Sequence, residues 1–294
     1  MLGTLPTCHL SPVQFLGDCY PEWLGTANFG RSRSCSDTTM NNRNLLERLL
    51  PIPRHAGELI MSIYATDFSI RDKADASPVT EADERAERAI VEALAALTPG
   101  VPIVSEEAAA LGRIPSVGER FWLVDPLDGT KEFISRNGEF TVNIALIEQG
   151  SPVIGVVFAP ALGRLFAGAH GVGAFVEDGQ TRRPIRCRLV PPEGLTVLAS
   201  RSHGDAAALD AFLAGKKVAA LRAAGSSLKL CLVAAGEADL YPRLGRTMEW
   251  DIAAGDAVLR AAGGCVRTLD GKMLLYGKSD FVNPHFYASA GGPM

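Results

Sequence analysis

The 294-residue sequence predicts an α+β / α/β protein, with an antiparallel sheet in its N-terminal half and a smaller α/β arrangement in its C-terminal half. Three observations support this class. Successive β-like runs, joined by turns such as that of residues 148–152, occupy residues 141–176. Strand and helix patterns alternate beyond residue 194. The 47% hydrophobic composition supplies enough apolar material for one large domain or two modest ones.

Residues 1–43 differ from the rest of the chain. They mix Gly, Pro, Ser, Thr and Asn, hold three of the six cysteines and show no sustained periodicity. We expect a disordered extension here, or a start assigned too early with Met40 as the true first residue. The opening residues lack the basic region and the clear cleavage site of a signal peptide, so secretion is disfavoured.

Two helical patterns precede the first strong strand pattern. Apolar residues recur at spacings of three and four over residues 44–63, and Pro51 and Pro53 must break or kink that helix. A second apolar stripe begins after Thr80, which can cap a helix. Asp83 is therefore expected in the first turn of this second helix.

Acidic residues follow two predicted strands. The β-like run 101–104 is followed by Glu106 and Glu107, and the run 121–124 is followed directly by Asp125. Loops at strand ends tend to build functional sites, so these acids are candidates for one.

The C-terminal half is expected to end on a clear helix at residues 249–262. Gly263 and Gly264 form its stop signal, and Asp251 lies in its first turn. The elements predicted before it are strands at 196–199, 218–222 and 239–241 and helices at 205–214 and 226–235.

Charge and composition exclude several classes of protein. The formal net charge of -4 gives no general basic field for a nucleic-acid backbone. No uninterrupted apolar run reaches the roughly 18 residues that a transmembrane helix needs. The cysteines form no C-x-x-C pair and no zinc-ligand spacing, which favours a reduced, cytoplasmic setting. Peripheral association with the inner face of the cell membrane stays open.

Residues 125–130 contain the strongest candidate for a metal site. Asp125 and Asp128 are three residues apart in a predicted turn, so both carboxylates and the Leu127 carbonyl can face one side. Magnesium prefers such oxygen ligands. Each acid alone is better explained as a solvated turn residue. Their combination with acids after apolar strands and with Asp251 favours a catalytic magnesium site.

Two longer motifs resemble those of the inositol monophosphatase superfamily. They are WLVDPLDGTKEF at residues 122–133 and WDIAAG at residues 250–255. The likeness continues in the same order through residues 137–143, 201–203 and 225–229, which are similar to the CysQ-type 3′(2′),5′-bisphosphate nucleotidase branch. Long, separated matches of this kind are highly specific. The resemblance covers nearly all of the chain after about residue 44.

This resemblance implies a layered αβαβα sugar-phosphatase-like fold. Residues 44–194 would form a metal-binding α+β half. Residues 195–294 would form a smaller α/β half that completes the metal and nucleotide site.

The resemblance also implies two bound Mg²⁺ ions and leaves a third open. Glu106, Asp125 and the Leu127 carbonyl would hold one ion, and Asp125, Asp128 and Asp251 would hold the second. Asp125 would therefore bridge them. Two such ions can stabilise both the entering and the leaving oxygens of an in-line phosphoryl displacement.

Three residues are implied to act in catalysis. Thr130, hydrogen-bonded to Asp83, would position and activate the attacking water near Glu106. From the local sequence alone, Asp83 and Thr130 could equally be helix-capping residues. Backbone N–H groups around Gly129 and Thr130 would cradle the phosphate if they open a helix.

A further group of residues is implied to bind the nucleotide. Local sequence alone favours ordinary capping by Ser226 and a solvated Lys229, whereas the resemblance makes both of them substrate contacts. His203 is expected to contact the nucleotide rather than a metal. The implied substrate-binding residues are Leu127, Asp128, Gly129, Thr130, Arg201, Ser202, His203, Gly225, Ser226, Ser227, Lys229 and Asp251.

The implied activity is that of a hydrolase, a magnesium-dependent phosphatase. It would remove the 3′-phosphate of adenosine 3′,5′-bisphosphate, giving AMP and phosphate, and would act also on 3′-phosphoadenylyl sulfate, in sulfate assimilation and nucleotide recycling. Lithium sensitivity is a family expectation. An inositol-phosphate phosphatase is the near alternative. A non-catalytic nucleotide-binding regulator is disfavoured because the acids are intact. The partner is a small-molecule nucleotide bisphosphate, not nucleic acid, and the oligomeric state stays open.

Overall fold

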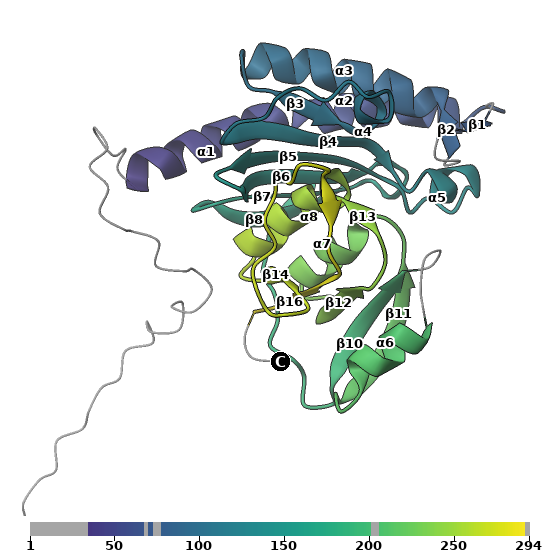
Figure 1. The fold of residues 1–294 in the computed structure, drawn as a ribbon, viewed down its shortest axis with the longest axis vertical. Coiled ribbons are helices and arrows are strands. Elements are labelled where there is room, and N and C mark those ends of the chain that lie inside the picture. Colours follow the sequence, from purple (N-terminus) through teal and green to yellow (C-terminus); the bar gives the residue numbers. More distant parts are fainter. Residues whose placement is uncertain (1–34, 68–69, 73–77, 201–205, 292–294) are drawn as a thin grey trace, which may run out of the picture.

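The computed structural model describes residues 35–67, 70–72, 78–200 and 206–291. Figure 1 shows a five-layer arrangement in which helices and two main sheets alternate. Helices α1 to α3 cover one face of the larger sheet, and α7 and α8 lie between the two sheets. Helix α6 lies on the far side of the smaller sheet, where Phe212 packs on Tyr287 with ring centroids 5.9 Å apart. The predicted layered fold is confirmed.

Two helices open the described chain. Helix α1 spans Cys35–Leu49 and α2 spans Pro51–Tyr64, so the predicted break occurs at Pro51. Proline is tolerated in the first turn of a helix but not in its interior, which explains why α2 begins there. The boundary expected at residue 44 falls inside α1, where the Asn42 side chain is buried and donates a hydrogen bond to the His170 carbonyl, 3.2 Å away.

A seven-stranded sheet forms the first half. Its spatial order is β3-β4-β5-β6-β7-β8-β9. The β3–β4 pair is parallel and the other pairs are antiparallel, as the run of strands and tight turns predicted. The strands are β3 Ile103–Ser105, β4 Arg120–Asp128, β5 Thr141–Glu148, β6 Ser151–Ala159, β7 Arg164–Ala169, β8 Gly173–Asp178 and β9 Thr181–Ile185.

Shorter elements surround this sheet. Helix α3 spans Glu81–Leu97 and buries the apolar stripe that the sequence predicted. The other elements are the antiparallel pair β1 Ile70–Asp72 and β2 Pro78–Thr80, the helices α4 Glu106–Ala110 and α5 Thr130–Ile134, and the 3₁₀ turn η1 Pro160–Leu162.

The second half contains a five-stranded sheet of order β11-β10-β12-β16-β14. Strand β10 runs parallel to both β11 and β12, while β16 is antiparallel to its neighbours. Its elements are β10 Leu195–Ser200, α6 Ala206–Leu213, β11 Val218–Ala224, α7 Leu228–Ala234, β12 Leu240–Arg243, β14 Cys265–Thr268 and β16 Phe286–Ser289. A separate small pair is formed by β13 Thr247–Met248 and β15 Val282–Asn283.

Helix α8, Glu249–Ala261, joins the two halves. It belongs to the second half by sequence but packs on β5, β6 and β7 of the first. A glycine on β6 makes this approach possible, because a Cβ atom at Gly155 would lie 2.3 Å from the Ala254 carbonyl oxygen. One hydrophobic core therefore contains residues of both halves, including Phe121, Val258 and Phe286.

No helix within the described ranges is long and apolar enough to cross a bilayer. Cys187, Cys231 and Cys265 are free thiols.

Candidate active site

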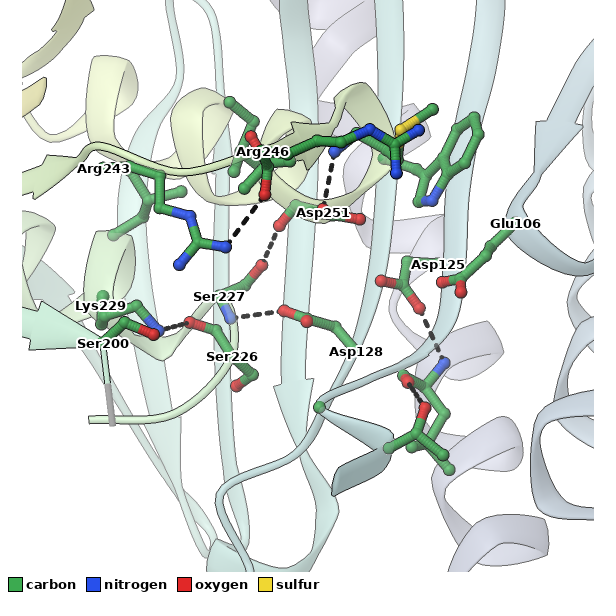
Figure 2. Close-up of a pocket in the computed structure, with 18 of the residues that line it drawn as sticks. Glu106, Asp125, Asp128, Ser200, Ser226, Ser227, Lys229, Arg243, Arg246 and Asp251 are labelled. Carbon is green, nitrogen blue, oxygen red and sulfur yellow. Dashed lines mark hydrogen bonds between the residues drawn. The ribbon is translucent and has the colours of Figure 1, made fainter. Parts of the chain in front are cut away.

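Four acidic side chains from three elements converge where the two halves meet (Figure 2). Glu106 is the first residue of α4, directly after β3. Asp125 and Asp128 lie on β4, and Asp251 lies in the first turn of α8. Because β3 and β4 are parallel neighbours, their carboxyl ends bring the acids that follow them to one edge of the sheet.

The segment 125–130 is not the simple turn that the sequence predicted. Strand β4 continues through Asp128, and the expected strand end at Val124 is wrong. The pairing with β5 shifts register between Asp125 and Asp128, and the Leu127 N–H donates to Asp125 Oδ1 at 3.0 Å. This irregularity turns both carboxylates toward the pocket, as bulges near sites commonly do.

The centre of the cluster is dense in negative charge. Oxygen atoms of Glu106, Asp125 and Asp251 lie within 4.8 Å of one another. Burial, followed by repulsion from Glu106 and the neighbouring aspartates, holds the pKa of Asp125 well above its usual range. Burial and the charges of Asp128 and Glu106 likewise raise the pKa of Asp251. Within the described ranges, no Lys or Arg forms an ion pair with Asp125 or Asp251.

This set of donors fits a hard divalent cation. Clustered carboxylates that repel one another are stabilised by a metal ion, and carboxylate oxygens are the ligands that Mg²⁺ prefers. Glu106, Asp125 and Asp251 supply such oxygens at mutual distances that one ion can span.

Asp128 is held by neutral donors from both halves of the protein. The Ser227 N–H donates to its Oδ2 at 2.6 Å, and Asn143 Nδ2 donates to the same oxygen at 3.4 Å. Burial raises the pKa of Asp128, although Lys229 and the donors of Ser227 and Asn143 oppose the rise. Ser227 itself donates its hydroxyl to the Asp251 carbonyl, so three predicted site residues are directly connected.

The expected contact between Thr130 and Asp83 is present. Thr130 Oγ1 lies 3.4 Å from Asp83 Oδ1 and 3.3 Å from the Leu127 carbonyl oxygen. Asp83 is buried in the first turn of α3, as predicted, while Thr130 lines the pocket. A five-residue helix, α5, begins at Thr130, and its N-cap Gly129 has a φ of +89°.

The acids line a pocket of about 570 Å³. Its other wall carries the cationic side chains of Lys229, Arg243 and Arg246, and an apolar part is formed around Ile114 and Trp250. Predicted site residues that line this pocket are Glu106, Asp125, Leu127, Asp128, Gly129, Thr130, Ser226, Ser227, Lys229 and Asp251.

Lys229 is buried rather than solvated. Its Nζ donates to the carbonyl oxygens of Ala224 and Ser226, at 3.1 Å and 2.7 Å. Burial lowers its pKa to about 8, against the opposing charge of Asp128. The capping interpretation of Ser226 is also wrong, because α7 begins at Leu228 and its N-cap is Ser227, which makes no side-chain capping bond.

Four predicted substrate-binding residues are not among the described residues that line the pocket. Arg201, Ser202 and His203 fall outside the described residues. Gly225 is adjacent to the pocket-lining residues, and its N–H donates to Glu139 Oε2 at 2.7 Å.

Two arginines and one asparagine of this site, Arg243, Arg246 and Asn143, were not predicted from the sequence. Arg243 Nη2 donates to the Arg246 carbonyl at 3.0 Å, which orders the segment just before α8. Two cations three residues apart, shortly before Asp251, were the available signal. Asn143 had no comparable signal, because its contacts to Asp128 and Ser227 depend on strand pairing and on the second half.

Comparisons with known proteins agree with this geometry. A model of the inositol monophosphatase family matches residues 41–291. The 3′(2′),5′-bisphosphate nucleotidase CysQ of Escherichia coli (strain K12) is 46% identical over 248 residues, which are 83% of this chain and 99% of the relative. The crystal structure of CysQ from Bacteroides thetaiotaomicron superimposes with a TM-score of 0.72 at 38% identity, covering 85% of this chain and 98% of that one. An IMPase of Thermotoga maritima has a TM-score of 0.70 at 30% identity, covering 84% and 92%.

Proposed function

Because the chain belongs to the inositol monophosphatase family, we propose that it is a magnesium-dependent phosphatase that removes the 3′-phosphate of adenosine 3′,5′-bisphosphate, giving AMP and phosphate. The observation that carries the choice of substrate is the 46% identity to a relative named 3′(2′),5′-bisphosphate nucleotidase over nearly the whole of that relative. 3′-Phosphoadenylyl sulfate, which presents the same 3′-phosphate, is the proposed second substrate.

The residues proposed to hold Mg²⁺ are Glu106, Asp125, Asp128, Asp251 and the Leu127 carbonyl. Their support is the mutual proximity of three of the carboxylates and the burial of Asp125 among like charges. Bound Mg²⁺ would neutralise charge that develops on the phosphoryl oxygens in the transition state. The number of ions, two or three, belongs to the proposal.

The protein's own groups then orient the water that attacks phosphorus. The Thr130 hydroxyl lies between the buried Asp83 carboxylate and the Leu127 carbonyl, so its proton has an acceptor on either side. Its oxygen lone pairs can therefore accept a proton of a water in the pocket. Asp83 fixes that hydroxyl and can receive a proton through it, which is the geometry of general-base catalysis.

The cationic wall is proposed to meet the phosphate that does not react. Arg243 and Arg246 bring planar, permanently charged guanidinium groups to the pocket, beside Asp251. A substrate with phosphate groups at both ends of its ribose presents negative charge to both walls. Arg201, Ser202 and His203 remain proposed substrate contacts.

A substrate panel tests this proposal. Phosphate release from adenosine 3′,5′-bisphosphate, 3′-phosphoadenylyl sulfate and inositol 1-phosphate is measured with and without Mg²⁺. We expect the two nucleotides to give the higher kcat/KM and the reaction to require Mg²⁺. The inositol-phosphate alternative has support in the 30% identity to the Thermotoga maritima enzyme, and a clear preference for inositol 1-phosphate would establish it instead.

The remaining proposals follow from the same family. Residues 44–194 are proposed to form the metal-binding half, and residues 195–294 to complete the site. Both halves contribute residues to the common hydrophobic core described above. A cytoplasmic setting and a place in sulfate assimilation are proposed together with this activity, and the free thiols among the described residues agree with a reducing compartment. Inhibition by lithium is expected in the Mg²⁺-dependent assay, and unchanged rates across a lithium titration would contradict it.

A further inference from the structure

The motif at residues 137–143 contains an acid, Glu139, that has no role in the reaction as described so far. It belongs to the first half, in the turn before β5, and reaches the second half. Its Oε2 accepts the Gly225 N–H at 2.7 Å. The turn itself is ordered, because the Glu139 N–H donates to Asn137 Oδ1 at 2.8 Å. Glu139 thus connects two segments that are far apart in the sequence.

The loop that Glu139 contacts, residues 224–227, is called the substrate loop below. It lies so close to Glu139 that only glycine fits at position 225. A Cβ atom there would be 2.8 Å from the Glu139 carbonyl oxygen and 3.0 Å from Glu132 Cγ. The backbone of the substrate loop is therefore packed directly against the turn that contains Glu139.

Lys229 holds the same loop through two of its carbonyl groups. Its buried ammonium group donates to the carbonyl oxygens on both sides of Gly225, those of Ala224 and Ser226. The charge of Glu139 favours the protonated form of Lys229, whose pKa burial lowers to about 8. One carboxylate and one ammonium thus fix two peptide groups of the substrate loop, the one between Ala224 and Gly225 and the one between Ser226 and Ser227.

The fixed loop ends on the acid cluster. The Ser227 N–H donates to Asp128 Oδ2 at 2.6 Å, and Asn143 Nδ2 donates to Ser227 Oγ at 2.8 Å. Between these anchors, Ser226 lines the pocket, and its Oγ is buried without a hydrogen-bond partner among the described residues. A displacement at Gly225 would move this hydroxyl relative to Asp128.

We propose that Glu139 is a positioning residue that sets the preference for substrates with two phosphate groups, by holding the substrate loop and Lys229 in one geometry beside the acid cluster. The proposal rests on the function proposed above. The reacting phosphate lies at the acids in every substrate of the enzyme. A substrate with a second phosphate depends more strongly on where the substrate loop lies, because Lys229, which holds the loop, belongs to the cationic wall proposed to meet that phosphate.

Paired kinetics test this role. We compare the wild type, Glu139→Ala and Glu139→Gln, with Glu92→Ala as a control at an exposed acid on α3. The substrates are adenosine 3′,5′-bisphosphate and adenosine 3′-monophosphate. We expect Glu139→Ala to lower kcat/KM for the bisphosphate by about tenfold more than for the monophosphate, mainly through KM, since a hydrogen bond to a charged group is lost. The glutamine variant keeps an acceptor oxygen, so its preference should stay within about threefold of the wild type.

Hydrogen exchange supplies a readout that does not depend on turnover. In Glu139→Ala, the amides of residues 224–230 should exchange faster than in the wild type, while the glutamine and Glu92→Ala variants should not differ from it. Equal exchange in Glu139→Ala would overturn the positioning role. Faster exchange with an unchanged substrate preference would also overturn it, because the loop would then move without affecting selection.

The two proposals fail in different ways. If the wild type shows no preference for the bisphosphate, the proposed function is wrong and there is no preference for Glu139 to set. If the wild type prefers the bisphosphate and Glu139→Ala keeps that preference, only the role of Glu139 is wrong.

Discussion

Two acids of helix α8, Asp251 and Asp256, lie little more than one turn apart and have opposite surroundings. Asp256 is fully buried and is neutralised inside the protein: Arg260 donates to both of its oxygens at 2.9 Å, and the Tyr276 hydroxyl donates at 2.8 Å. Asp251 accepts the Met248 N–H at 2.8 Å but otherwise lies among the carboxylates of Glu106 and Asp125.

The contrast appears in the causes of their pKa shifts. Burial raises the pKa of Asp256, and the charge and hydrogen bonds of Arg260 oppose that rise. Burial also raises the pKa of Asp251, and there the charges of Asp128 and Glu106 add to the rise and outweigh the opposing Met248 N–H and Arg243. The fold therefore supplies its own cation where an acid is structural. At the pocket it gathers acids whose charge a cation from solution can neutralise.

Replacing the central acid of the cluster should have the largest effect on activity. Asp125→Asn removes the carboxylate proposed to bridge the metal ions and keeps the shape of the side chain. We expect Mg²⁺-dependent phosphate release to fall by about 10³-fold or more, on the scale of losing a principal electrostatic contact to the transition state. Steady-state kinetics on purified protein measure this.

The same variant carries its own folding control. Because Asp125 is buried beside like charges, the uncharged asparagine should leave the metal-free protein at least as resistant to urea as the wild type. Full activity in Asp125→Asn would refute the bridging role. Lost activity together with a large loss of stability would show that Asp125 is structural.

The ion pair between Asp256 and Arg260 should give the reverse result, because breaking it should lower stability and leave activity unchanged. Arg260→Met leaves Asp256 buried without its cation, so the free energy of unfolding should fall by about 3–5 kcal/mol. The molecules that remain folded should keep the kcat of the wild type. Urea unfolding and kinetics on the same preparation separate the two quantities. The double variant Asp256→Asn/Arg260→Met should recover part of the stability, since no charge is left unpaired, and failure to recover any would contradict the ion-pair explanation.

Mg²⁺ should stabilise the folded protein by binding at the acid cluster around Asp125, and the Asp256–Arg260 pair should not contribute to this effect. At about 100 times its dissociation constant, an ion that binds only the native state adds about 2.7 kcal/mol to the free energy of unfolding. We expect Mg²⁺ to raise the thermal midpoint of the wild type and of Arg260→Met equally, and to have little effect on Asp125→Asn. Sodium chloride at matched ionic strength is the control. An equal rise in Asp125→Asn would place the stabilising ion elsewhere.

Sequence reasoning found the site by its local patterns and missed what depends on distant contacts. The apolar strand before Asp125 and the helix that begins before Asp251 are local features, and both were predicted correctly. The register shift after Asp125 depends on pairing with β5, so the sequence suggested a turn instead. The burial of Lys229 was missed for the same reason, because it arises when the substrate loop docks on the first half.

A third acid, Asp239, provides the smallest and most specific test of internal pairing. It lies just before β12, where Arg188 donates to both of its oxygens at 2.8 Å and the Thr196 N–H donates at 2.7 Å. Burial opposes the shift, but the hydrogen bonds and charge of Arg188 hold the pKa of Asp239 below its usual range.

A depressed pKa stabilises the folded state above the unfolded pKa of about 3.9, and this contribution is lost as the pH falls through the folded value. Asp239→Asn should therefore lower the free energy of unfolding by about 1 kcal/mol at pH 7, which is the usual contribution of one hydrogen-bonded charged pair. The loss should become progressively smaller below about pH 4. Urea unfolding across this range measures the difference, and a cost that does not change with pH would show that packing, not charge, is what Asp239 contributes.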